Sequence, residues 1–453
     1  MAIRAFAISA VLLCEALLTG GVVAQEVVGE VTYVQGITSA QRSGQETRFL
    51  AQGDKIIKGE VLSTSERGYA VLGLADGSRF TLRSNTAFVI QELDQSRGRE
   101  TLLMGLLRGG LRAFSGAIGK VRGSQVRLST PTATIGIRGT EFDARLCAAD
   151  CRREAQFAQP GPRVAAEDRV AARAVAVSGE ASAVGRDGGA RLLAQGGAVF
   201  DGESVRTGAG AFAVLAFRDQ TRITVIESSS IKLDNVRFAD APADGNFAVR
   251  LLAGGLRAFS GLIAKANRGR VRFVTPTATI GIRGTGLDIR DAPDGVYLHV
   301  WDGAGALEFN GSEVVVERDR AGMHARGRPG PELLESVPQF FRDEPAPRPD
   351  RVDVDFERLF ATRRQDDVLP GLYVGVRGGG VELAARGGTI DLGPLEAGFL
   401  AEGGDDPQRI EPLPGFLFND TNPLPDTPEL RPLRLIELLG PGRLSASDQC
   451  LLQ

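Results

Sequence analysis

The chain of 453 residues is poor in the side chains that usually ligate metals, with two histidines and four cysteines. We therefore expect no metal site and no cofactor. Lysine plus arginine (53) nearly balance aspartate plus glutamate (56), so no basic surface favours nucleic-acid binding. Aromatic residues make up 6% of the chain, whereas glycine occurs 58 times, well above the usual ~7% of residues. This combination indicates many tight turns between short strands.

Only the N-terminus carries a long apolar run. Arg4 precedes apolar residues 5–18, and Val22 and Ala24 fit the −3 and −1 positions of a signal-peptide cleavage site. We expect residues 1–24 to be a signal peptide that is cleaved before Gln25. An uncleaved anchor is the alternative, although the run is shorter than the ~20 apolar residues that a span needs. The mature protein would be periplasmic or secreted, without a transmembrane segment.

The chain contains internal repeats. Residues 109–116 and 254–261 both read GGLRAFSG, and residues 130–140 and 275–285 both read TPTATIGIRGT, with the same separation in both pairs. The segment that begins at Gly371 resembles the earlier one that begins at Gly295. The sequence therefore holds two copies of one unit, and its C-terminal region repeats the end of the second copy.

These repeats predict a division of the chain. The predicted parts are a signal peptide (1–24), a first domain (26–151), a linker (152–172), a second domain (173–325), a Pro-rich linker (326–370), a C-terminal β unit (371–408) and a Pro-rich tail (409–453).

The copies have the pattern of strands. Residues 30–34 alternate between apolar and polar side chains, and Asp76-Gly77 is a hairpin signal. Around Gly109-Gly110 we predict a strand, a turn and a second strand, because each glycine inside a helix costs about 1 kcal/mol relative to alanine. Strand patterns recur at a spacing of roughly 8 to 12 residues, which is typical of sandwiches, barrels and solenoids. The predicted class is all-β, with a β-solenoid or roll favoured and a β-sandwich as the alternative.

The repeated TPTATIGIRGT segment predicts a strand with one buried face. Proline can open a strand but cannot sit in its middle, so Pro131 marks the start. Ala133, Ile135 and Ile137 would share one face and Arg138 the other. The glycines of this segment allow a bulge or the close approach of another backbone.

The glycine-containing turns between strands occur together with the Gln52-Gly53-Asp54 sequence and the TPTATIGIRGT segment. In these features residues 26–146 and 173–325 resemble the FecR domain family of bacterial extracytoplasmic proteins. The resemblance implies an all-β extracytoplasmic module. The best-known members cross the inner membrane, control a sigma factor through a cytoplasmic segment and relay a signal from an outer-membrane receptor. This chain departs from that plan, since its apolar stretch begins at residue 5 and it carries two domain copies. We therefore carry over the fold and an interaction role, and not sigma-factor control.

An Arg-x4-Asp pair occurs in both copies, as Arg138 with Asp143 and Arg283 with Asp288. Arginine suits bidentate pairing with a carboxylate, so we favour an ion pair within each domain. A charge pair that binds a partner is the alternative.

Two cysteines stand close together after the first motif, in Cys147-Ala-Ala-Asp-Cys151. In an exported protein this spacing predicts a local disulfide. The second copy has no cysteine there, so the fold does not need the bridge. Cys450 remains as a free thiol or an intermolecular link.

Tyr297, His299 and Trp301 alternate on one predicted strand. Tyr297 and Trp301 are a candidate aromatic binding face for a glycan or peptide, although a packed sheet face is favoured. His299 and His324 are expected to be isolated rather than to form a metal site.

We find no nucleophile elbow, no HExxH motif and no P-loop, and we expect no catalytic residues. The predicted function is a non-catalytic interaction or scaffold module of the cell envelope. It would bind another envelope protein, or a cell-wall or surface polymer, for example through sheet edges. The alternatives are a signal-relay protein that engages an outer-membrane receptor and a glycan-active enzyme on a β-solenoid. We make no prediction for the oligomeric state.

Overall fold

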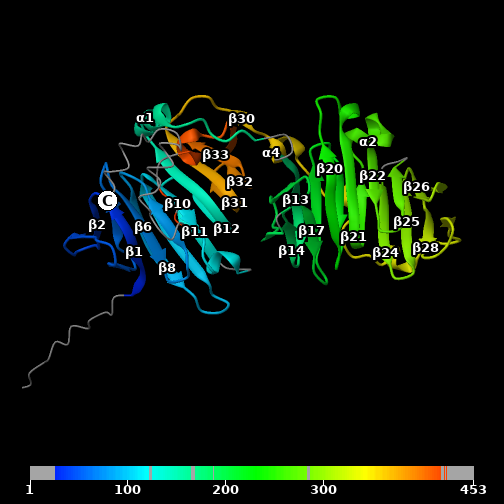
Figure 1. The fold of residues 1–453 in the computed structure, drawn as a ribbon, viewed down its shortest axis with the longest axis horizontal. Coiled ribbons are helices and arrows are strands. Elements are labelled where there is room, and N and C mark those ends of the chain that lie inside the picture. The colour runs from blue at the N-terminus through cyan, green and yellow to red at the C-terminus, as the bar shows by residue number, and fades with distance from the viewer. Residues whose placement is uncertain are drawn as a thin grey trace, which may run out of the picture.

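Strands far outnumber helices in this protein, and the all-β prediction is confirmed. The structure is a computed structural model that describes residues 26–121, 125–164, 169–186, 188–282, 286–419, 423 and 425, so the predicted signal peptide and Cys450 lie outside the described residues. Figure 1 shows two β bodies side by side. Each is a curled, mixed sheet, in which parallel pairs such as β9–β11 and β21–β22 join a mainly antiparallel ladder.

The first body, unit 1, comprises residues 26–157 and 363–419. Its strands before unit 2 are β1 (Val27–Gln35), β2 (Thr38–Gln41), β3 (Arg48–Phe49), β4 (Lys55–Ile57), β5 (Val61–Thr64), β6 (Tyr69–Leu74), β7 (Arg79–Leu82), β8 (Ala87–Asp94), β9 (Thr101–Arg108), β10 (Gly110–Phe114), β11 (Gln125–Ser129) and β12 (Thr134–Cys147). Its strands after unit 2 are β30 (Arg363–Arg364), β31 (Gly371–Ala385), β32 (Gly388–Leu392), β33 (Glu396–Ala401) and β34 (Gln408–Glu411).

The second body, unit 2, comprises residues 170–333. Its strands are β13 (Val170–Ser178), β14 (Ala181–Val184), β15 (Ala190–Leu192), β16 (Ala198–Phe200), β17 (Ser204–Thr207), β18 (Phe212–Phe217), β19 (Arg222–Val225), β20 (Ser230–Arg237), β21 (Asn246–Phe259), β22 (Val271–Val274), β23 (Thr279–Ile282), β24 (Gly286–Ala292), β25 (Gly295–Asp302), β26 (Ala304–Phe309), β27 (Ser312–Glu317), β28 (Arg320–Ala325) and β29 (Glu332–Leu333). The α-helices described for the chain are α1 (Asp150–Phe157), α2 (Leu262–Ala266), α3 (Gln339–Arg342), α4 (Phe356–Phe360) and α5 (Gly415–Phe418).

The C-terminal strands complete the sheet of unit 1. Strand β31 lies antiparallel to β12, with Asp143 opposite Gly375, as β25 lies beside β24 in unit 2, with Asp288 opposite His299. The two strand pairs are equivalent, because the sequence repeats align Asp143 with Asp288 and Gly375 with His299. Figure 1 shows the orange C-terminal strands against the cyan β12. Unit 2 is thus inserted between two strands that pair with each other in unit 1.

Burial of apolar side chains explains this pairing. Leu372, Val374 and Val376 of β31 are buried in the same apolar cluster as Ile135 and Phe142 of β12. Unit 2 has a separate cluster built from its own strands. Because burying apolar surface is the main favourable term in folding, the C-terminal strands belong energetically to unit 1.

The predicted turn at Gly109-Gly110 is wrong, although the strands on both sides are present. Strands β9 and β10 do not pair with each other: β9 pairs with β8 and β11, and β10 pairs with β7 and β12. In unit 2 the matching strand, β21, runs through Gly254 without interruption. Gly109 and Gly254 have φ of +79° and +76°, and a Cβ on Gly109 would lie 2.5 Å from the Cα of Thr86. Glycine therefore makes a bend inside a strand here.

The TPTATIGIRGT segment forms the predicted strand, but the strand begins at Thr134 rather than at Pro131, which lies in a turn before it. The Thr130 hydroxyl donates to the Ala133 carbonyl and accepts from the Ala133 amide, which closes the turn before β12. Ala133, Ile135 and Ile137 are buried, whereas Arg138 is exposed. The register of β12 against β31 shifts between Arg138 and Glu141, which places a bulge at the glycine.

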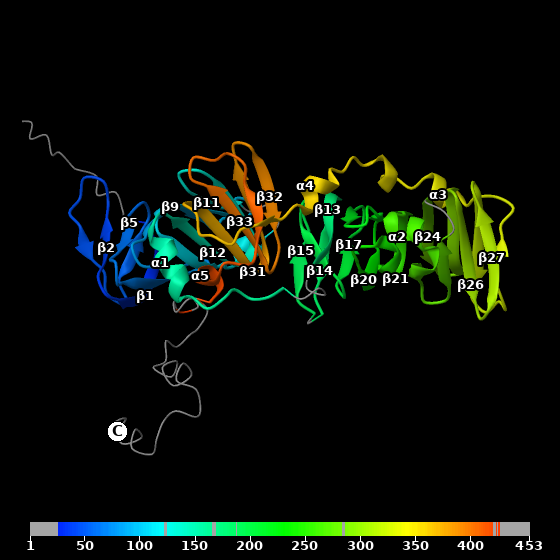
Figure 2. The same ribbon diagram turned by 90° about the horizontal axis from the view of Figure 1, so that it is seen from above.

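The two predicted linkers carry structure of their own. Helix α1 occupies the start of the first one, and β13 begins before its end. In the second linker, α3, a 3-10 turn at Pro349–Arg351 and α4 follow one another. Figure 2 shows this yellow segment running back along unit 2 toward unit 1.

Candidate functional site

Arg138 and Asp143 do not pair with each other, which corrects the ion pair predicted from their spacing. Five residues of extended strand separate their Cα atoms by roughly 16 Å. Arg138 instead joins the two units: its guanidinium lies 2.7 Å from the Glu382 carboxylate and 3.3 Å from the Asp391 carboxylate, both in unit 1. It also donates to the Gln195 carbonyl of unit 2 at 3.3 Å.

Asp143 is fully buried and accepts hydrogen bonds from three arginines. Arg83 and Arg112 donate to its Oδ1 at 2.8 and 2.9 Å, and Arg377 of β31 donates to its Oδ2 at 2.8 Å. Arg83 and Arg112 are themselves almost inaccessible. Three guanidinium groups carry more N–H donors than the Asp143 carboxylate can accept, so the remaining donors are available to further hydrogen-bond acceptors.

Asp288 is the matching centre in unit 2. Arg257 donates to its Oδ1 at 2.9 Å and to its Oδ2 at 3.4 Å. His299 Nδ1 lies 3.1 Å from Oδ2, and the Trp301 indole donates to Oδ1 at 3.2 Å. Arg283, predicted to pair with Asp288, lies outside the described residues.

A C-terminal segment covers the Asp143 centre. We call this segment strap 1; it consists of residues 415–419 together with Pro423. The Phe416 carbonyl accepts from Arg83 at 2.8 Å, and the Leu417 carbonyl accepts from Arg112 at 3.0 Å. Arg377 donates to the Leu417 and Phe418 carbonyls at 2.9 and 2.8 Å. All of these acceptors belong to the main chain of the strap.

The Pro-rich linker covers the Asp288 centre in the same manner. We call residues 340–352 strap 2. Arg257 donates to the Ala346 carbonyl at 2.8 Å, and Arg222 donates to the Val352 carbonyl at 2.8 Å. The Thr224 hydroxyl donates to the Pro347 carbonyl at 2.8 Å. Thr81, at the matching position of unit 1, donates to the Pro423 carbonyl of strap 1 at 3.0 Å.

The two units therefore hold a covering segment with the same groups. Each has a threonine on the strand after the hairpin turn at Asp76 or Asp219, an arginine from the repeated GGLRAFSG segment and an aspartate after the TPTATIGIRGT segment. These groups define carbonyl site 1 (Thr81, Arg112, Asp143) and carbonyl site 2 (Thr224, Arg257, Asp288). The aspartate orients the arginine, and the arginine and the threonine bind backbone carbonyls.

The candidate aromatic face at Tyr297 and Trp301 is covered by strap 2. Tyr297 packs edge-on against Phe340 at 5.2 Å between ring centroids. Its hydroxyl donates to Asp294 at 2.6 Å, which raises the pKa of Tyr297 to about 12. Trp301 stacks on Phe259, and the Arg348 guanidinium lies 3.7 Å from the Trp301 ring centroid. The face thus contacts a peptide segment, and that segment belongs to the chain itself.

The disulfide between Cys147 and Cys151 is confirmed, with a Cα–Cα distance of 5.4 Å. Cys147 ends β12 and Cys151 lies in the first turn of α1. Both are buried beside Tyr373, Phe416 and Leu417. The bridge therefore ties the start of α1 to the end of β12, and the C-terminal segment that contains strap 1 packs beside it.

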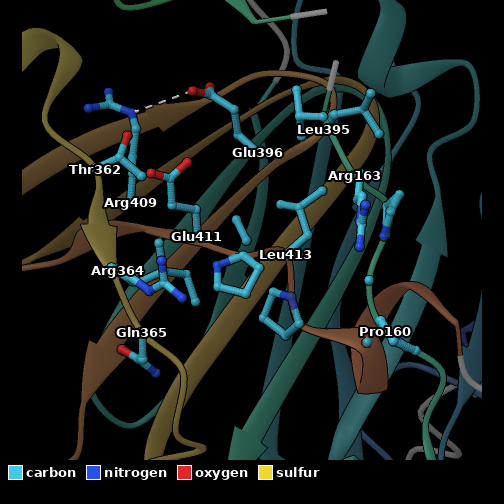
Figure 3. Close-up of a pocket in the computed structure, with 18 of the residues that line it drawn as sticks. Pro160, Arg163, Thr362, Arg364, Gln365, Leu395, Glu396, Arg409, Glu411 and Leu413 are labelled. Atoms are coloured by element: carbon cyan, nitrogen blue, oxygen red, sulfur yellow. Dashed lines mark ion pairs between the residues drawn. The ribbon is translucent and has the colours of Figure 1, made fainter. Parts of the chain in front are cut away.

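A cavity of about 930 Å³ lies between the units (Figure 3). Arg409 and Glu396 form one side of it, with 4.0 Å between the Arg409 Nε and the Glu396 carboxylate, and Pro160 and Arg163 lie on the other. Burial and the neighbouring Arg173 lower the pKa of Arg409 to about 10. The cavity wall mixes arginines, carboxylates and prolines, so its chemistry selects no one class of ligand.

Neither a metal centre nor a membrane-spanning helix is found in the described part of the chain. Its His, Cys, Asp and Glu side chains form no group of three or more that could hold a metal ion. Among the helices that the structure describes, none has the length and apolar composition of a membrane span. His299 and His324 contact different partners: Asp288 for the first, and the Arg328 carbonyl and the Phe309 ring for the second.

Several carbonyl-binding residues, Arg222 and Arg377 among them, were not predicted from the sequence. Arg112 and Arg257 lie in the repeated octet, and Thr81 and Thr224 occupy matching positions upstream. Their repetition was a usable signal, because charged residues that recur inside an apolar strand need a buried partner. Arg83 has no such signal, since its matching residue in unit 2 is Ile226.

Comparison with known proteins agrees with the repeated architecture. Residues 60–156 and 203–304 each match the FecR protein family. No curated protein matches the chain. Two crystal structures of a candidate anti-sigma factor from Parabacteroides distasonis ATCC 8503, at 2.50 and 1.65 Å resolution, are similar at 10% and 9% identity with a TM-score of 0.25. The similarity covers 31% of this chain and 62% of those chains, which is less than two thirds of their length. Two regions of this chain, one in each unit, thus match the FecR family.

Proposed function

We propose that this protein is an exported, non-catalytic FecR-type interaction module of the bacterial cell envelope and that it binds another envelope protein. The observation that carries the proposal is the repeated carbonyl site. In each unit an arginine fixed by a buried aspartate, together with a threonine, holds the main-chain carbonyls of a covering segment.

This arrangement suits recognition of extended peptide. Extended and proline-containing segments leave many of their carbonyls without partners in a helix or sheet, so these carbonyls can accept hydrogen bonds from a protein surface. Donors that contact only main-chain carbonyls can bind peptides of many sequences. Neighbouring pockets for side chains then add selectivity for particular peptides. Because the same site occurs in both units beside different segments, binding of such segments is a property of the unit rather than of one sequence.

The family match supports a FecR-like envelope regulator module. Export to the periplasm or beyond, after cleavage near Ala24, is part of the proposal and rests on the N-terminal sequence. The peptide-binding geometry favours a protein partner over a cell-wall polymer, which offers few carbonyls in a regular extended array. A signal relay from an outer-membrane receptor is one form that such an interaction could take.

The test is capture from chemically cross-linked cell envelopes with the mature chain from Gln25, tagged after purification. One envelope protein recovered in a fixed ratio to the bait is the expected result. Recovery of wall polymer alone, or of nothing specific, would contradict the proposal.

A matched pair of variants links the capture to the carbonyl sites. Thr81→Val together with Thr224→Val removes both hydroxyl donors while keeping the side-chain shape. Ser312→Ala, on an exposed hairpin of unit 2, is the control. We expect the threonine variant to recover less partner and the serine variant to recover an unchanged amount.

A further inference from the structure

We infer that carbonyl site 2 binds an extended, proline-containing and arginine-bearing segment of a partner protein, and that strap 2 occupies the site as an internal competitor. The inference rests on the proposed function and names the chemistry of the partner.

The main chain of strap 2 makes the shared contacts. Its carbonyls at Ala346, Pro347 and Val352 accept from Arg257, Thr224 and Arg222 respectively. Three prolines, at positions 345, 347 and 349, restrict the backbone of the strap to extended conformations. Such a segment loses little conformational entropy when it binds, so few contacts suffice to hold it.

One side chain of the strap has a pocket of its own. The Arg348 guanidinium lies over the Trp301 ring at 3.7 Å, and Trp301 stacks on Phe259 at 6.0 Å between centroids. Asp350 of the strap pairs with Arg348 at 2.9 Å and holds it in this position. Arginine is the side chain that stacks best on an indole while keeping its hydrogen bonds. An arginine that follows a Pro-x-Pro sequence is therefore the expected selective feature of the ligand.

The strap is attached weakly enough to be exchanged. Phe341 anchors the N-terminal end of strap 2, but in the part that holds the carbonyl contacts, residues 343–352, only Ala346 and Pro349 are buried. In strap 1, by contrast, Phe416, Leu417 and Phe418 are all buried in an apolar cluster. Segments with few buried apolar contacts open locally at low free-energy cost. We therefore assign the exchangeable site to unit 2, while strap 1 is an integral part of unit 1.

Trp301 fluorescence can report occupation of carbonyl site 2, because Trp301 is the single tryptophan of the chain and contacts Arg348 of strap 2. The full chain is prepared with residues 343–352 replaced by a glycine-serine segment of equal length. A synthetic peptide with the sequence of residues 343–352 is then titrated while Trp301 fluorescence is recorded. We expect saturable binding that restores the emission of the unaltered chain.

Two matched changes make the test specific. A peptide with alanine at the position of Arg348 should bind about tenfold more weakly, since it lacks the cation over the indole. The change Thr224→Val in the replaced chain should weaken both peptides alike, because the hydroxyl contacts only the main chain. Absence of saturable binding, or equal binding of the two peptides, would overturn the inference.

A second variant covers the case in which the replaced chain does not fold. Arg348→Ala in the otherwise unaltered chain keeps the strap but removes its arginine. The peptide must then displace the altered strap and restore the emission, and failure to do so overturns the inference. A chain that binds the peptide but captures no envelope protein contradicts the proposed function alone. Capture of a partner without any peptide binding contradicts the inference alone.

Discussion

Replacing Asp143 with asparagine should destabilise unit 1 far more than the matching change at Asp288 destabilises unit 2. Asp143 is fully buried and balances three guanidinium groups at 2.8 to 2.9 Å, two of them nearly inaccessible. Asparagine keeps the shape but removes the buried carboxylate that all three guanidinium groups share, and Glu141, 3.9 Å from the Arg377 Nε, remains near only one of the contacts described. Removing one partner of a buried ion pair costs about 3–5 kcal/mol, and we expect Asp143→Asn to reach the upper end of that range.

Asp288→Asn is the matched control. Only one arginine, Arg257, pairs with this carboxylate among the described residues, and its other contacts are His299 and the neutral indole of Trp301. We expect a loss of about 2 kcal/mol, the strength of hydrogen bonds to one charged group. Hydrogen exchange resolved by peptide measures each unit separately, and Trp301 fluorescence follows unit 2. A loss at Asp143 no larger than that at Asp288 would refute the electrostatic argument.

Three further predictions concern other parts of the structure. Burial raises the pKa of Asp391 to about 6. Because the folded state binds the Asp391 proton more tightly than the unfolded chain does, the free energy of unfolding should fall by about 3 kcal/mol as pH rises from about 4 to 6. Asp391→Asn should remove this dependence of stability on pH, measured by denaturation at several pH values. Replacing Cys147 and Cys151 with serine should lower the stability of unit 1 by about 2 kcal/mol, the value for so short a loop, and an equal effect on Trp301 unfolding in unit 2 would contradict the placement of the bridge. Gly254→Ala should cost roughly 3 kcal/mol because its Cβ would meet the Ser228 carbonyl at 2.7 Å at a φ of +76°; Gly210→Ala, at a φ of +65° with open space around it, should cost about 1 kcal/mol in the same thermal denaturation assay.

Local features of the fold followed from the sequence because they depend on neighbouring residues. The hairpin at Asp76-Gly77 forms with Gly77 at a φ of +82°, and the alternation of Ala133, Ile135 and Ile137 gives the buried face that was predicted. The Cys147–Cys151 bridge also depends only on local spacing.

The features that were missed depend on long-range pairing. Many strands share the same apolar pattern, so the pattern cannot choose the partner of β31. The repeat in the C-terminal region did identify the partner. Strand β31 repeats β25, and β12 repeats β24; because β25 pairs with β24, β31 is expected to pair with β12. The partners of Asp143 were missed for the same reason, since Arg83, Arg112 and Arg377 come from separate segments that meet only in the folded sheet.

The central claim is the proposal that the carbonyl site of a unit is where this protein binds an extended segment of an envelope protein. The most direct measurement is photo-cross-linking in intact cell envelopes from a photoreactive residue placed at Tyr297, which lies beside strap 2. Phe157, 83% exposed on α1, provides the control position. We predict that position 297 cross-links to a proline-containing segment of one envelope protein, as well as to strap 2, and that position 157 does not. The same set of products from both positions, or products within the chain alone, would contradict the account.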